Sequence, residues 1–235
     1  VIDVSVAAGH AAIIEGDILH ILDVSDSAQM HEVGSVVLPN QPESLTVLNG
    51  RAYVADHSGV RIVDVSNPRK PVLMGLIEAE ASPSELAFDG QDGYFVSAGH
   101  IYRVNMNEPT TAVALNETAF SYWVRNLTIV DGLAFLSAGS AGVRIWDVSE
   151  RNTAIEIGSY QTAGLALAND VAQDKLFLVD CDDGLLVIDV SDSTKPHVTG
   201  MLPIIGVLSN VAVTGDYVYA TSGFNGRLHL LDVRD

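Results

Sequence analysis

Apolar residues alternate with polar ones along short segments of the chain, and turn-forming residues separate these segments. The clearest example covers residues 45–77, where LTVL, AYVA, VRIVDV and PVLMGLI are separated by NG, DHSG and SNPRKP. Alternation with a period of two predicts half-buried β-strands, and Gly, Asn, Asp and Pro predict the turns between them. No unit contains a helix-length pattern with a 3.6-residue period, so we expect an all-β chain.

One phrase recurs along the chain, as ILDVS, RIVDVS, RIWDVS, LVIDVS and LLDVRD. A degenerate copy, IYRVNMN, fills the one long gap and puts Asn105 in the place of the aspartate. The aspartate position then recurs every 41, 41, 42, 42 and 43 residues, at Asp23, Asp64, Asn105, Asp147, Asp189 and Asp232. Four strands in a period of this length are typical of propeller blades. The count predicts a six-bladed β-propeller with about 41 residues and four antiparallel strands per blade.

Two further landmarks repeat with the same step. A large apolar residue recurs as Ile13, Tyr53, Phe95, Phe135, Phe177 and Tyr219. A turn glycine, which we expect to have positive φ, recurs as Gly9, Gly50, Gly90, Gly132 and Gly215, with Asp174 in the fifth unit. A second glycine series, after the Asp-Val-Ser phrase, comprises Gly34, Gly75, Gly158 and Gly200.

We expect one propeller domain over residues 1–235, in which the last blade lacks its outer strand because the chain ends soon after Asp232. The exposed edge of that blade would invite pairing with another chain. The expected repeats are 1–43, 44–84, 85–125, 126–168, 169–208 and 209–235.

The RIVDVSNP phrase at 61–68, followed by a proline-bounded strand, resembles the LVIVD-repeat family of propeller proteins. The resemblance covers nearly the whole chain and is weakest in the third unit. It implies a bacterial or archaeal protein that is exported or displayed at the cell surface, in a family mostly without an assigned activity. We therefore expect an extracellular or cell-surface location, and any export signal would lie upstream of Val1. A further alternative, suggested by the missing initial methionine and the missing last strand, is that the propeller is one domain of a larger surface protein.

Charge narrows the choice of partners. The chain has 30 acidic and 12 basic residues, a formal net charge of -18, which would repel nucleic acid and anionic lipid surfaces. No apolar run approaches the roughly 18 residues of a membrane helix, so we expect no direct membrane insertion. The single cysteine, Cys181, excludes an internal disulfide.

A polar residue precedes each innermost strand, and in a propeller all six would encircle the channel mouth. A ring of carboxylate and amide oxygens could hold a metal ion near the channel axis, and calcium is the metal that such ligands suit. No cofactor is firmly predicted, and calcium is the candidate. The arrangement is similar to that of six-bladed calcium-dependent lactonases and phosphotriesterases. The alternative is that these are solvated residues entering a strand. The predicted metal ligands are Asp3, Glu85, Asn126, Asp170 and Asn210, with Ser44 in the remaining blade.

The longer connections carry candidate ligand-binding residues: Ser44, His57, Tyr122, Trp123 and Arg125. An aromatic ring beside Arg125 is a plausible platform on which a sugar or a cationic group could stack. The alternative for Trp123 is a loop side chain that packs as a plug. The repeated aspartate of the Asp-Val-Ser phrase is expected to accept backbone N–H groups in the following turn, which is a structural role.

No nucleophile elbow or other catalytic constellation is present. The sequence therefore favours a non-enzymatic binding or scaffolding propeller that presents its channel mouth or its open blade edge to a protein or carbohydrate partner. The alternative is a calcium-dependent lactonase or esterase with His57 as the candidate base. These two function classes stay open at this point.

Overall fold

A computed structural model describes residues 3–7, 9–84, 86–90, 92–106, 112–116, 118–203, 208–223 and 226–233. These residues form strands, turns and bends without a helix, so the described part has no helix that could cross a bilayer. The chain divides into two compact units, Val1–Leu86 with Gly90–Ala114, and Ala87–Asp89 with Leu115–Asp235.

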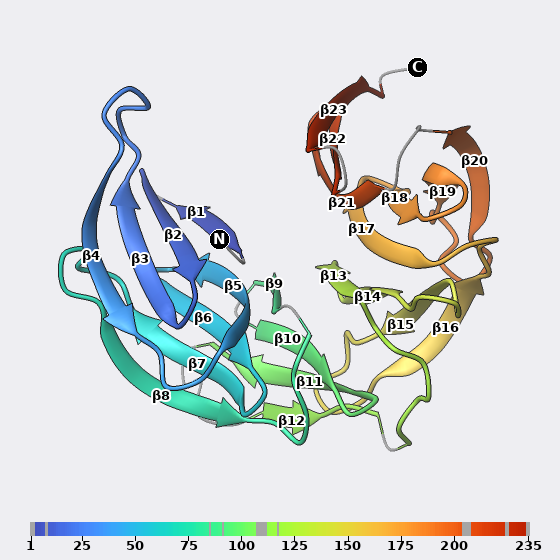
Figure 1. Ribbon diagram of the computed structural model, residues 1–235. Coiled ribbons are helices and arrows are strands. Elements are labelled where there is room, and N and C mark those ends of the chain that lie inside the picture. Colours follow the sequence, from blue (N-terminus) through green and yellow to red (C-terminus); the bar gives the residue numbers. More distant parts are fainter. Residues whose placement is uncertain are drawn as a thin grey trace. The chain divides into compact units, whose positions relative to one another are not determined.

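Six antiparallel sheets, in which successive strands pair with each other, make up the fold (Figure 1). They are the blades of a six-bladed β-propeller whose last blade has three strands, which confirms the predicted fold class. Blade 1 contains β1 (Val4–Ala7), β2 (His10–Glu15), β3 (Ile18–Asp23) and β4 (His31–Val37); blade 2 contains β5 (Pro42–Leu48), β6 (Arg51–Asp56), β7 (Gly59–Asp64) and β8 (Val72–Glu78).

The remaining blades follow the same order along the chain. Blade 3 contains β9 (Ala87–Asp89), β10 (Asp92–Ser97), β11 (His100–Asn105) and β12 (Ala112–Ala114). Blade 4 contains β13 (Asn126–Val130), β14 (Leu133–Ser137), β15 (Val143–Asp147) and β16 (Ile155–Tyr160). Blade 5 contains β17 (Ala166–Ala172), β18 (Lys175–Asp180), β19 (Gly184–Asp189) and β20 (His197–Leu202), and blade 6 contains β21 (Leu208–Thr214), β22 (Tyr217–Ser222) and β23 (Arg227–Asp232).

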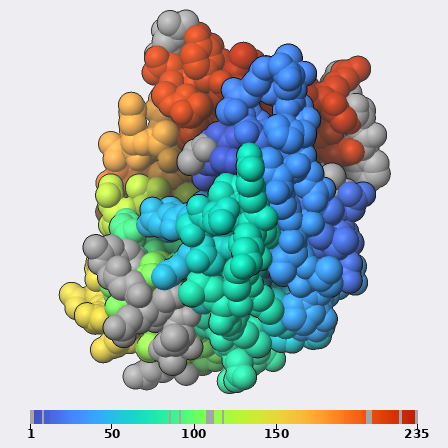
Figure 2. All heavy atoms as spheres, turned by 90° about the vertical axis from the view of Figure 1, so that its left-hand side faces the viewer, coloured from blue at the N-terminus to red at the C-terminus, as the bar shows by residue number. Residues whose placement is uncertain are grey.

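Apolar side chains on facing strands form the core between successive blades within each unit. In the first unit, Ile14 and Leu19 of blade 1 pack with Val54 and Val63 of blade 2. In the second unit, Phe135 of blade 4 belongs to the cluster that fills the space against blade 5. The outer strands β4 and β8 are mostly exposed and cover much of the face seen in Figure 2.

In blades 1, 2, 4 and 5 the aspartate of the Asp-Val-Ser phrase accepts a backbone N–H in the following turn, as predicted. The aspartate accepts the backbone N–H of the serine two residues later, at 3.0 Å for Asp147 and Ser149, and the valine N–H of the phrase donates to the turn between the first two strands, at 2.9 Å from Val148 to the Gly132 oxygen. Equivalent aspartate bonds occur at Asp23, Asp64 and Asp189. The turn glycines Gly9, Gly50, Gly90, Gly132 and Gly215 all have positive φ, as expected; in the fifth unit the positive φ belongs to Gln173 instead of Asp174.

The strand register corrects the predicted series of large apolar residues. In blade 4, Phe135 lies opposite Thr128 and Ile145, and the residue in the same position of blade 1 is Ala12, opposite Ser5 and Ile21. Ile13 therefore lies one residue too far along its strand, and so does Phe95. A shift of one residue moves a side chain to the other face of the sheet. The true series is Ala12, Tyr53, Tyr94, Phe135, Phe177 and Tyr219.

Two glycines of the second series, Gly34 and Gly158, mark a close approach between blades. Each glycine of this series lies opposite the third strand, beside a one-residue β-bulge in the outer strand; Gly158, for example, lies opposite Ile145. A Cβ atom on Gly158 would collide with the Ser193 carbonyl oxygen of blade 5. A Cβ atom on Gly34 would likewise collide with the Pro68 oxygen of blade 2.

Candidate functional site

The segment between β12 and β13 is fixed to blade 4 at both of its ends. Ala154 N donates to the Leu115 oxygen at 3.0 Å, and Arg125 N donates to the Ser137 oxygen at 2.8 Å. The side chains of Leu115 and Val124 are buried. These anchors hold the intervening aromatic residues against one blade.

Tyr122 is packed into an aromatic cluster on blade 4. Its ring stacks on Phe120 with ring centroids 4.4 Å apart, and Phe120 also contacts the buried Trp146 of β15. Trp146 Nε1 donates to the Tyr122 hydroxyl at 3.0 Å, which satisfies the indole N–H. Tyr122 thus packs as a plug, with its hydroxyl as the acceptor for Trp146.

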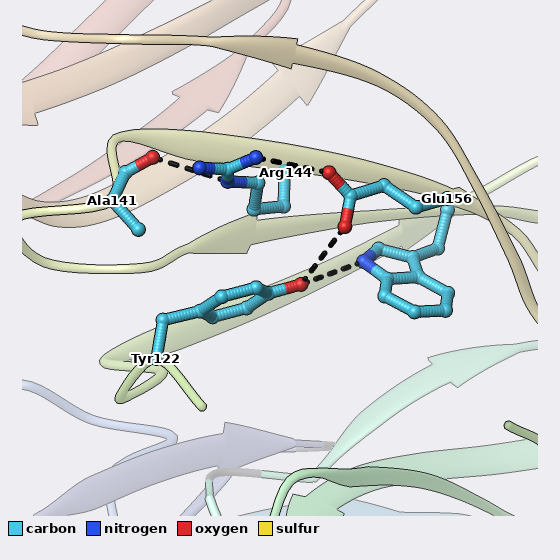
Figure 3. A network of polar contacts seen from close by, with 5 residues as sticks. Tyr122, Ala141, Arg144 and Glu156 are labelled. Carbon is cyan, nitrogen blue, oxygen red and sulfur yellow. Dashed lines mark hydrogen bonds and ion pairs between the residues drawn. The ribbon is translucent and has the colours of Figure 1, made fainter. Parts of the chain in front are cut away.

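A polar network continues from the Tyr122 hydroxyl (Figure 3). The hydroxyl lies 3.4 Å from Glu156 Oε2, and Arg144 Nη1 donates to Glu156 Oε1 at 3.1 Å. Arg144 Nε donates to the Ala141 oxygen at 3.1 Å, which fixes the guanidinium relative to the turn before β15. Burial is the main cause that raises the pKa of Tyr122, so the phenol keeps its proton.

Trp123 makes none of the ring contacts found within this cluster of described residues. Its side chain is 70% exposed, and the Arg125 guanidinium carbon lies 4.2 Å from the centre of its ring. This cation–π contact holds the indole beside a positive charge in an otherwise acidic protein. Of the three predicted platform residues, Trp123 and Arg125 form an exposed pair, which we call the Trp123–Arg125 platform. Tyr122 packs against Phe120 as part of the fold.

Ser44 and His57, the other predicted ligand-binding residues, lie in the first unit. Ser44 is half-buried in β5, opposite Ala55. His57 is exposed in the turn between β6 and β7, next to a buried ion pair of Asp56 with Arg61. The described residues place no carboxylate in hydrogen-bonding contact with the His57 ring, as a general base would use. Their role in binding or catalysis stays a prediction.

The predicted metal ligands form hydrogen bonds with backbone N–H groups. Asp3 accepts Val4 N through Oδ1 and Leu45 N of blade 2 through Oδ2, both at 2.7 Å. Asn126 Oδ1 accepts Asn169 N of blade 5 at 3.0 Å. Asn210 Oδ1 accepts Val211 N at 2.8 Å. Two of these side chains therefore join the innermost strand of one blade to that of the next.

Asp170 does not occupy the same position as the others. It lies opposite Phe177, as Ser5 lies opposite Ala12, and Ala168 takes the position of Ser44 and Asn210 in blade 5. The carboxylate of Asp170 accepts Val171 N at 2.8 Å and Val213 N of blade 6 at 2.7 Å. Burial raises the pKa of Asp170, and likewise that of Asp3, above the ordinary value of 3.8.

Glu85, the remaining metal-ligand prediction, lies outside the described residues. Among the described residues, no group of three His, Cys, Asp or Glu side chains is arranged to hold a metal ion. Calcium binding stays a prediction. In this structure the side-chain oxygens of Asp3, Asn126, Asp170 and Asn210 accept hydrogen bonds from backbone N–H groups of the same or the following blade.

Sequence reasoning missed Phe120, Arg144, Trp146 and Glu156 as parts of the site. Arg144 and Trp146 lie two residues apart in β15, so their side chains share one face of the sheet. This spacing in the sequence could have indicated the shared face. Their contact with the segment before β13 depends on how that segment folds back on the blade. No local pattern in the sequence encodes this contact.

The repeat itself identifies the family. A family model described as the LVIVD repeat matches residues 1–37, 42–78, 171–202 and 205–233, which together are more than half of the chain. The chain belongs to the LVIVD-repeat family. No curated protein matches this LVIVD-repeat chain.

Solved structures resemble the LVIVD-repeat chain in fold. The computationally designed Ika8 protein has a TM-score of 0.77 at 11% identity, with 99% of this chain and 70% of that chain covered. A chain of the mitotic checkpoint complex has a TM-score of 0.78 at 12% identity, with coverage of 97% and 74%. AztD of Citrobacter koseri has a TM-score of 0.61 at 16% identity, with coverage of 99% and 68%. At such low identity these likenesses concern the fold alone.

Proposed function

We propose that this LVIVD-repeat propeller is a non-enzymatic binding module whose main contact surface is the Trp123–Arg125 platform. The observation that carries the proposal is the exposure of Trp123, at 70%, under the guanidinium of Arg125. A large exposed indole is costly to leave in water, and a stacked arginine reduces the freedom of both side chains before binding. The platform is therefore pre-organised for a partner.

A protein is the partner class that this surface favours. Trp, Tyr and Arg are the residues that most often dominate the energy of protein interfaces. The net charge of -18 would steer a partner with a positive surface towards the chain. Trp123 could also stack on a sugar ring, so a carbohydrate is the competing partner class.

We also propose an exported or cell-surface location. The support is the acidic composition, together with the resemblance of the repeats to exported propellers. A binding module with a rigid scaffold and a partner recognised by a loop residue fits such a location, because loops on rigid scaffolds carry most binding sites. Fractionation of the source cells with an antibody against the chain tests this part.

The binding proposal is tested by capture of partners from the secreted and envelope fractions, compared between wild type and Trp123→Ala. Met201→Ala is the control, because Met201 is also a largely exposed apolar side chain of the second unit, at 54%. We expect the partner recovered by wild type to be retained by Met201→Ala. Removal of a central interface tryptophan weakens binding by about thirtyfold or more, so Trp123→Ala is expected to lose the partner.

Affinity for the recovered partner is then measured with purified proteins at several ionic strengths. Weaker binding in Arg125→Ala is expected because this variant loses the cation–π contact that restrains the indole of Trp123. Slower association at high salt is expected from the charge argument. Equal affinity in wild type and Trp123→Ala would overturn the platform. Binding of wild type to soluble oligosaccharides, lost in Trp123→Ala, would instead assign the platform to a carbohydrate.

A further inference from the structure

A cavity of about 310 Å³ lies between blades 1 and 2, and all of its lining residues belong to the first unit. The Trp123–Arg125 platform belongs to the second unit. Its lining runs from the buried Ala12 and Ile21 to the exposed Ser66. The other lining residues are Ser5, Ala7, His10, Val47, Gly50, Val65 and Pro68. Most of this lining is apolar, with the polar groups confined to a few positions.

The cavity coincides with a break in the repeat. Ala12 occupies the position at which the other five blades have an aromatic residue: Tyr53, Tyr94, Phe135, Phe177 and Tyr219. In blade 4, the ring of Phe135 is 2% exposed and packs in the core against blade 5. The methyl group of Ala12 leaves the corresponding space against blade 2 without a ring.

A small residue at position 7 of β1 enlarges the space further. Ala7 and His10 pair at the end of β1 and β2, where blade 4 has the pair Val130 and Leu133. Ala7 thus replaces a larger apolar residue of blade 4. A dry apolar cavity of about 150 Å³ is already large enough to bind a benzene ring in another protein, and cavities of about 300 Å³ fall in the range of small-molecule sites.

We propose that this cavity binds a small molecule with one aromatic ring, which takes the place of the side chain missing at position 12. The apolar space between Ala12, Ile21 and Val47 would hold the ring. A polar group on the ring would face Ser5. The Oγ of Ser5 accepts Val47 N at 3.0 Å, and the described residues show no acceptor for the hydroxyl proton of Ser5. A phenol-like compound is therefore the ligand class that the lining fits.

The proposal is tested with 4-fluorophenol as the probe, by fluorine NMR titration and by thermal melting of the whole chain. Wild type is expected to bind the probe saturably and to melt at a higher temperature in its presence, because the ligand binds the folded state only. Ala12→Phe restores the ring of the other blades. This variant is expected to raise the Tm without ligand by about 2–4 °C and to weaken probe binding by at least about tenfold.

Three further variants serve as controls. Ala212→Phe adds the same ring at an exposed position of β21 in the second unit and is expected to bind the probe like wild type. If Ala12→Phe fails to fold, Ala12→Val fills the space in part and is expected to weaken binding by a smaller factor. Ser5→Ala is expected to reduce the preference for 4-fluorophenol over fluorobenzene.

Three results would overturn the proposal: no saturable binding by wild type, equal binding by wild type and the folded Ala12 variants, or binding of cyclohexanol as tight as that of 4-fluorophenol. Each result concerns the first unit and leaves the test of the platform unaffected. The platform test, which uses Trp123→Ala, likewise leaves the cavity unchanged.

Discussion

At the scale of single residues, two glycines of the outer strands allow neighbouring blades to approach each other closely. Gly158 faces the Ser193 carbonyl oxygen of blade 5 so closely that a Cβ atom would overlap with it. Gly34 faces the Pro68 oxygen in the same way in the first unit. Because the obstacle is backbone, it cannot move aside as the end of a flexible side chain could.

Gly158→Ala is expected to destabilise the fold by about 1–3 kcal/mol, since an added methyl group in a packed region forces the backbone to shift. Gly200→Ala is the control, because its nearest neighbour for a Cβ atom is Val187 Cβ at an ordinary 3.5 Å. Urea unfolding of the two variants and wild type measures the difference. A Gly158→Ala protein as stable as Gly200→Ala would show that this glycine is not needed for the contact between blades.

At the scale of the strand and its turn, the Asp-Val-Ser phrase makes two kinds of hydrogen bond. Its ionised aspartate accepts the serine N–H, and its valine N–H donates to the turn between the first two strands. The side-chain hydroxyl of Ser149, and then its backbone N–H, lower the pKa of Asp147 below the ordinary value of 3.8. A carboxylate with a lowered pKa in the folded state stabilises the fold above its unfolded pKa, and this contribution is lost as pH falls through the folded pKa. The same direction holds for Asp23, Asp64 and Asp189.

Asp147→Asn is therefore expected to be less stable than wild type at about pH 7, with a difference that shrinks as the pH falls below the ordinary pKa of a carboxyl group. Protonated Asp147 and Asn then differ little. Urea midpoints measured across this range, with Glu150→Gln as a control for the loss of one exposed negative charge, test the effect. A difference independent of pH would contradict the role of the ionised carboxylate.

The register of the strands separates what the sequence could predict from what it could not. The period of the Asp-Val-Ser phrase predicts the number of blades and the strand order, because one unit of this pattern forms one sheet. The face of each side chain depends on a shift of one residue, and the turns between the second and third strands differ in length, as between Gly16–Asp17 and 138–142. The aspartate step of 41 residues leads from Tyr53 to Ala12 and Tyr94, whereas the choice of a large apolar residue in each unit leads to Ile13 and Phe95.

The site shows the same division. Trp123 and Arg125 could be predicted because they are a large aromatic and a cation in a long connection. The contacts of Tyr122 with Trp146 and Glu156 could not be predicted, since they depend on how the segment before β13 folds over blade 4. Asp170 was placed with Asp3 because both precede apolar residues, but the residue at that position in blade 5 is Ala168.

At the scale of the whole molecule, the chain combines a regular scaffold with two local departures from regularity. The scaffold is the LVIVD repeat, which builds six similar sheets. One departure is the aromatic segment on blade 4, and the other is Ala12 in blade 1. A repeat fold keeps its stability through the regular positions, so the irregular positions are the ones available for recognition.

If a partner binds the Trp123–Arg125 platform, it buries Trp123, and hydroxyl-radical footprinting measures this burial directly. In the free protein, Trp123 and Met201 are both exposed, at 70% and 54%, and both are expected to oxidise rapidly. With the captured partner bound, the account predicts that oxidation of Trp123 slows severalfold while that of Met201 is unchanged. Oxidation of Trp123 at the same rate with and without the partner would contradict the account.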